Sequence, residues 1–253
     1  MELWTKEHGL TLLPAVAVML LVTGVLRRWL LKKPHPVRLI PLQIIACILV
    51  VLEIGKQAVS LSRGYDLYNL PFHFCSLFIF ALPVMALYKG KYRQQVYGVV
   101  TALCAAMTLL TLIYPNLIYG AGSVNHYFKD YMSFHTVTFH NLVILAFFLI
   151  LGLELHTPAS KGEGRCVVLF TLGFCVVAAT MAQLLKTNYA GFYSCNVPVF
   201  ESVRVALQPV IGTVPTQIVY VLIIAVLHVA FTYGTYRLYR LLRYLIGKKQ
   251  TAM

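Results

Sequence analysis

Two side chains that can do chemistry lie two residues apart in an apolar stretch of the sequence. The stretch is NLPFHFCSLFIF, residues 69–80, and it contains His73 and Cys75. Asn69 is a good helix N-cap and Pro71 is tolerated in a first helical turn, so we expect a helix to begin here. The positive end of that helix would keep the His73 imidazole neutral, and a neutral imidazole can act as a base or as a hydrogen-bond partner.

The role of Cys75 depends on which histidine it can reach. Side chains at i and i+2 point to different sides of a helix, so His73 would not form a local thiolate–imidazole pair with it. His140, from another part of the chain, could supply the base of a Cys–His dyad. The alternative is that Cys75 is a small buried thiol, which is the common role of a free cysteine.

A polar stripe precedes this segment. Its side chains occur at i, i+3, i+4 and i+7 and are Glu53, Lys56, Gln57 and Ser60. This spacing places all four on one face of a helix. A charged side chain inside a membrane costs at least about 2.5 kcal/mol, so we expect Glu53 and Lys56 to pair with each other and to face a protein interior or a wet cavity. Such a pair could bind part of a substrate, or it could only fix helix packing.

A second polar segment reads SFHTVTFHN and contains His135, His140 and Asn141. Histidines five residues apart turn away from each other on a helix, so we expect no metal clamp and only one histidine that faces the interior. We favour His140, because Ser133 and Thr136 extend a polar face toward it.

Further polar side chains follow a later apolar run, and they are Gln183, Lys186, Asn188 and Tyr189. These groups and the earlier ones lie at comparable depth and toward the same side of the membrane. The sequence therefore predicts an outward-facing polar pocket to which four helix ends contribute.

The elements that position these residues are membrane helices. The chain has 253 residues, of which 59% are hydrophobic and 11% charged, whereas soluble domains have about a quarter of charged residues. Apolar runs of about 20 residues predict seven transmembrane helices, at residues 10–31, 37–59, 69–88, 95–114, 134–153, 166–185 and 215–236. We expect an all-α, polytopic membrane helix bundle that forms one domain over residues 1–253.

Positive charge predicts the orientation of this bundle. Most of the 21 lysines and arginines fall on alternate connections, so the positive-inside rule places the N-terminus outside and the C-terminus in the cytoplasm, as in a multi-pass protein of the plasma membrane. The net charge of +13 then belongs near anionic headgroups. We expect membrane lipids as partners and no nucleic acid. The sequence contains no GxGxxG, P-loop, HExxH or Cys/His metal spacing, so we expect no cofactor and no metal.

The segment NLPFHFCSL resembles the L-P-x-H-x-C segment that opens a span in the YwaF-like family of bacterial integral membrane proteins. Glu53 resembles the intramembrane acid of that family, and Asn188 and Tyr189 resemble its Asn-Tyr segment before a proline. The YwaF-like family is in turn distantly similar to a vertebrate transmembrane acyltransferase family that remodels ether phospholipids through a cysteine and a histidine. This resemblance implies a catalytic role for His73 and His140.

The sequence departs from the vertebrate pattern at the nucleophile. In the vertebrate motif the cysteine immediately precedes the histidine, and Phe72 occupies that position here. Cys75 therefore matches the vertebrate cysteine in residue type and not in position.

Three classes of function follow from these residues. The first is acyl transfer to or hydrolysis of a lipid ester, with His73 or His140 as the base and Cys75 or a lipid hydroxyl as the nucleophile. Asn141 or Asn188 would donate a hydrogen bond to the oxyanion, and Glu53 with Lys56 would orient a headgroup or a histidine. The second class is transport or sensing of a small polar solute by the same pocket. The third is a membrane scaffold whose polar stripe only holds helices together.

Overall fold

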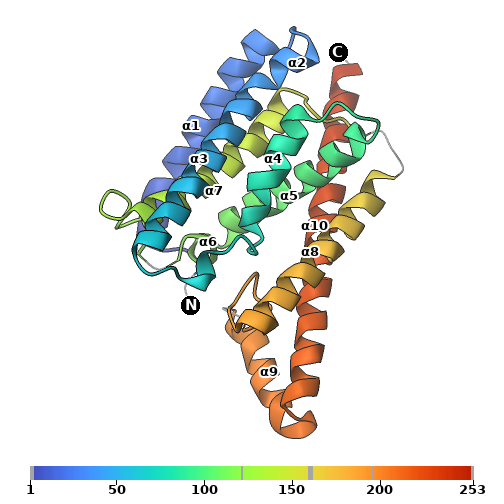
Figure 1. The fold of residues 1–253 in the computed structure, drawn as a ribbon. Coiled ribbons are helices and arrows are strands. Elements are labelled where there is room, and N and C mark those ends of the chain that lie inside the picture. The colour runs from blue at the N-terminus through green and yellow to red at the C-terminus, as the bar shows by residue number, and fades with distance from the viewer. Residues whose placement is uncertain (1–2, 121, 159–161, 195–196, 252–253) are drawn as a thin grey trace.

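The described part of the chain is built from helices (Figure 1). The computed structural model describes residues 3–120, 122–158, 162–194 and 197–251, and every regular element in these ranges is helical. Six helical stretches are long and apolar enough to cross a membrane, which confirms the helix-bundle fold class and six of the seven predicted spans. They are α1 (Lys6–Leu30), α2 with α3 (His35–Arg38 and Ile40–Ser62), α5 (Arg93–Ile113), α7 (Tyr131–Gly152), α8 (Glu163–Leu185) and α10 (Thr213–Thr251).

Shorter helices occupy the connections. They are η1 (Leu67–Asn69), η2 (Cys75–Leu77), α4 (Phe78–Leu87), α6 (Pro115–Tyr119) and α9 (Pro198–Ile211). Four of the described helices have a proline at one of their first two positions, where a backbone N–H would have no partner within the helix. The connection between α8 and α10, which lies between the predicted spans 166–185 and 215–236, contains a helix of 14 residues.

The start of α7 shows how a side chain fixes a helix boundary. The Asp130 carboxylate accepts a hydrogen bond from the Ser133 backbone N–H at 3.0 Å, as an N-cap residue does. A second oxygen of this carboxylate lies 3.1 Å from the Arg63 guanidinium, just after α3. Both contacts lower the pKa of Asp130 below its usual range, and the hydrogen bond from the Ser133 backbone has the larger effect.

The helices form two groups around α5. Figure 1 shows α1, α3 and α7 side by side, and the contacts of α7 with both of the others agree. The second group is the pair α8 and α10, with α9 packed on α10 at the end that projects beyond the rest of the bundle. α5 contacts α4, α7, α8 and α10, and its Ala102, Leu103, Cys104 and Ala106 are fully buried. The central helix α5 therefore joins the two groups.

The predicted span 69–88 differs from the other six. Its predicted start at Asn69 is wrong, because residues 70–74 form no helix and the chain becomes helical again only at Cys75. The helical stretch Cys75–Leu87 is about 20 Å long at 1.5 Å per residue, shorter than a hydrocarbon core of about 30 Å. The two termini lie at opposite ends of the bundle in Figure 1. Within residues 65–74 the only helical element is the short η1, so this segment joins α3 to η2 mostly without a helix.

We predict that Asp130→Ala lowers the stability of the protein by about 1 kcal/mol, because the helix loses its N-cap. Asp130→Asn is the control, since asparagine keeps the capping oxygen and should retain most of this stability. The folded-state pKa of Asp130 is lowered, so its contribution is present above the unfolded-state pKa and is lost as pH falls through the folded-state pKa. Thermal unfolding in detergent at neutral and acid pH measures this. An Ala variant as stable as wild type at neutral pH would contradict the prediction.

Candidate functional site

A cavity of about 560 Å³ lies between the two helix groups. On one side it is lined by α3, by residues 68–76 and by α7, with α5 and α6 behind them. On the other side it is lined by α10 and by parts of residues 188–200. Its volume falls within the range of about 300–1,000 Å³ that is usual for ligand pockets. The polar residues that the sequence analysis assigned to one depth meet largely at this cavity.

The Glu53 carboxylate is the charged centre of the cavity wall. Its Oε1 lies 2.8 Å from the Lys56 ammonium and accepts a hydrogen bond from the Gln57 amide at 2.7 Å. Its Oε2 lies 3.3 Å from Nε2 of His135 on α7. The side chains of Glu53 and Lys56 are only 10% and 12% exposed. The predicted pairing of Glu53 with Lys56 is confirmed, and His135 adds a third partner that ties α3 to α7.

The rest of the polar stripe holds the non-helical segment in place. The Gln57 side chain donates a hydrogen bond to the Asn69 carbonyl at 2.7 Å, and it accepts one from the Tyr65 hydroxyl at 2.7 Å. The Asn69 amide in turn donates to the Ser60 hydroxyl at 2.9 Å. From the other helix group, the Tyr189 hydroxyl donates to the Leu67 carbonyl at 2.5 Å. Side chains thus supply hydrogen bonds to the backbone of this segment, which a membrane protein needs where the backbone is not in a regular helix.

His73 lies on this segment, before the helix begins. Its Nε2–H donates a hydrogen bond to the Tyr68 carbonyl at 2.8 Å, because a carbonyl can only accept. In the neutral ring Nδ1 then carries the lone pair. The ring is also packed edge-on against the rings of Tyr68 and Tyr189, at 4.4 and 5.3 Å between centroids. His73 is therefore an oriented base, although the carbonyl of Tyr68 orients it rather than the end of a helix.

Both histidines of α7 line the cavity, so the expectation that only one faces the interior is wrong. His135 points toward Glu53 on α3, whereas His140 packs edge-on against Tyr119 of α6 at 6.1 Å. The cavity is wide enough to reach both sides of α7. Nδ1–H of His140 donates to the Thr136 carbonyl at 2.6 Å, which leaves its Nε2 as an acceptor.

Cys75 is the first residue of the helical stretch and also lines the cavity. Contrary to the sequence prediction, His73 and Cys75 are not on one helix, because His73 precedes the helix. The two side chains line the same cavity.

The other predicted binding residues lie at the edge of the cavity or behind its wall. Asn188 lines the cavity, and its carbonyl oxygen accepts hydrogen bonds from the backbone of Tyr193 and Ser194, so its NH₂ group is the part that can donate to a ligand. Three residues lie outside the lining and support it: Asn141 accepts from the Tyr119 hydroxyl, Gln183 donates to the Phe192 carbonyl, and Tyr189 packs on His73.

One cavity residue was missed by the sequence analysis. His228 of α10 lines the cavity from the side opposite Glu53. Its signal was present, since an ionisable residue in the middle of the apolar run 215–236 is uncommon in a membrane helix. The described residues contain no group of three or more His, Cys, Asp or Glu side chains that could hold a metal ion.

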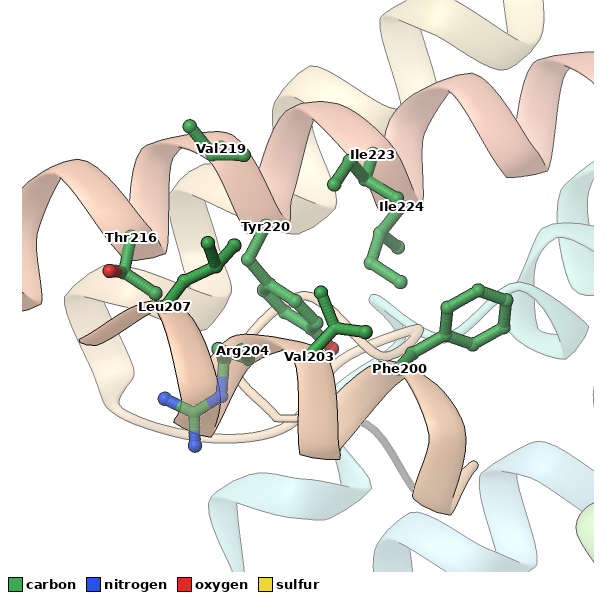
Figure 2. Close-up of a pocket in the computed structure, with 9 residues that line it drawn as sticks. All are labelled: Phe200, Val203, Arg204, Leu207, Thr216, Val219, Tyr220, Ile223 and Ile224. Carbon is green, nitrogen blue, oxygen red and sulfur yellow. The ribbon is translucent and has the colours of Figure 1, made fainter. Parts of the chain in front are cut away.

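Helix α9 packs along the outer part of α10 (Figure 2). Phe200, Val203 and Leu207 of α9 face Tyr220 and Ile224 of α10 across a gap of only about 20 Å³. This gap is too small for a ligand, so the contact is structural. Because Phe200 also lines the large cavity, α9 forms part of its wall.

Comparisons with known proteins identify a family. A model of the TMEM164 family matches residues 3–236, a range that contains every residue of the cavity. No curated protein and no solved structure matches the chain. The resemblance to YwaF-like proteins, the plasma membrane location and the outward orientation of the cavity remain predictions.

We predict that Lys56→Met lowers stability by about 3 kcal/mol, because it leaves the Glu53 carboxylate in a buried site without its cation. The double variant Glu53→Gln, Lys56→Met should lose much less than the sum of the two single variants, since it removes both charges together. A double-mutant cycle of thermal unfolding in detergent measures the coupling. Additive losses would show that the two side chains do not interact.

Proposed function

This chain belongs to the TMEM164 family of transmembrane proteins, and on that premise we propose that its cavity catalyses acyl transfer from, or hydrolysis of, a membrane phospholipid. The observation that carries the proposal is a thiol and two oriented imidazoles in one cavity of a membrane helix bundle: Cys75, His73 and His140 line it together. Acyl transfer needs such a nucleophile with a base beside it.

The cavity also suits a lipid. Leu227 and Phe231 line it from α10, and these side chains are 39% and 37% exposed. The cavity wall therefore continues onto a surface that faces hydrocarbon in a membrane. An acyl chain can enter along this apolar wall, while Lys56 at the opposite wall offers an ammonium group to the phosphate of the headgroup.

The first half of the reaction forms an acyl-enzyme. Sγ of Cys75 attacks the carbonyl carbon of the lipid ester, a C–S bond forms and the ester C–O bond breaks. His73 or His140 takes the thiol proton and returns it to the leaving glycerol oxygen. The NH₂ group of Asn188 donates a hydrogen bond to the carbonyl oxygen as negative charge develops there. In the second half, the thioester passes its acyl group to water or to a lipid hydroxyl, and the thiol is restored.

The test is lipid turnover by the purified protein in liposomes that contain a phospholipid with one labelled acyl chain. Wild type should release or transfer the labelled chain. Cys75→Ser should lower the rate at least about 100-fold, and so should alanine at whichever histidine takes the proton, His73 or His140. Matched controls are Cys47→Ser and His126→Ala, since both side chains are exposed and lie outside the cavity lining.

Two results would contradict the proposal. A rate that is unchanged in Cys75→Ser would remove the proposed nucleophile. No turnover by wild type, together with uptake or binding of a small polar solute that depends on Glu53 and Lys56, would favour the transport class of function instead.

A further inference from the structure

His228 is the ionisable residue that α10 contributes to a mostly apolar part of the cavity wall. The other cavity-lining residues of α10 are Ile224, Leu227, Phe231 and Thr232. An imidazole in the middle of a membrane helix is unfavourable unless it has a partner or a function. Only one of its two ring nitrogens has a hydrogen-bond partner within the described ranges, because Nδ1–H donates to the Ile224 carbonyl at 3.0 Å.

This hydrogen bond decides what the other ring nitrogen can bind. In the neutral ring with Nδ1 protonated, Nε2 carries a lone pair and accepts a hydrogen bond. A ligand group that binds there must therefore be a donor. Nε2 is an uncharged acceptor among mostly apolar side chains. In a cavity that holds lipid, the donor that suits it is a hydroxyl group.

The orientation of the His228 ring is fixed by aromatic neighbours from both sides of the cavity. Phe192 stacks on it with 5.4 Å between centroids, and Phe174 of α8 lies at 6.4 Å. Phe74, whose ring centroid lies 5.9 Å away, is the residue immediately before Cys75. His228 thus packs against Phe74, the neighbour of the proposed nucleophile. Its ring is held in a fixed orientation, as that of a catalytic base needs to be.

We propose that Nε2 of His228 forms a subsite for the acyl acceptor, a lipid with a free hydroxyl group such as a lysophospholipid. This inference rests on the proposed function. The hydroxyl oxygen attacks the carbonyl carbon of the acyl-Cys75 thioester while His228 takes its proton. A new ester C–O bond forms, the C–S bond breaks, and the departing thiolate receives the proton from His228. The subsite favours transfer over hydrolysis, because it binds a lipid hydroxyl in place of water.

The experiment compares wild type with His228→Gln in liposomes that contain acyl-labelled phospholipid and a lysophospholipid acceptor. Glutamine can still hydrogen-bond a hydroxyl group but cannot act as a base. Two quantities are measured, the acyl-Cys75 adduct by intact-protein mass spectrometry and the labelled phospholipid formed from the acceptor. His228→Gln should form the adduct at the wild-type rate, accumulate it, and lower transfer to the acceptor at least about 100-fold.

Leu222→Ala is the matched control, since Leu222 is on the same helix, is 60% exposed and lies outside the cavity lining. If His228→Gln transfers the acyl group to the acceptor at the wild-type rate, the acceptor subsite is overturned and the proposed function is not. Loss of adduct formation together with transfer would also overturn it, because His228 would then serve the first half-reaction or the fold. Absence of the adduct in wild type would overturn the proposed function, and the subsite with it.

Discussion

The arrangement of this protein depends on one constraint, which is that backbone hydrogen-bonding groups inside a membrane must find partners within the protein. Residues 65–74 join α3 to η2 with only the three-residue helix η1 among them. Gln57 and Ser60 of α3 and Tyr189 from the other helix group hydrogen-bond this segment, either at its backbone or through the Asn69 side chain. Tyr68, Asn69 and His73 of this segment line the cavity, so the side chains that hold the segment also fix this part of the cavity wall.

The same constraint explains why charge is tolerated here. Glu53 is bound by Lys56, Gln57 and His135, so a carboxylate that would be costly in lipid becomes a junction between α3 and α7. The opposite wall is built differently. α10 contributes three apolar side chains, His228 and Thr232. A cavity with one charged wall and one mostly apolar wall is what the proposed phospholipid substrate requires.

Much of the fold and part of the candidate site could be predicted from the sequence. The remainder could not, because it depends on tertiary packing. Composition and apolar length predicted the helix bundle, and spacing alone predicted the Glu53–Lys56 pair, because both depend on local periodicity. The helix start at Asn69 was predicted wrongly, because capping preference is local whereas this segment is fixed by side chains from α3 and from residue 189. His228 was missed although an ionisable residue in the apolar run 215–236 is a signal, and its place at the cavity depends on tertiary packing of α10.

The central claim is that residues 65–74 form part of the wall of a cavity that holds a phospholipid ester beside Cys75. Cryo-electron microscopy of the protein in lipid nanodiscs tests it most directly. The account predicts lipid density in the cavity, with the phosphate at Lys56, an acyl chain along Leu227 and Phe231, and the ester carbonyl in contact with Sγ of Cys75. A continuous helix from Asn69, or a cavity closed by side chains with no lipid between α3 and α10, would contradict the account.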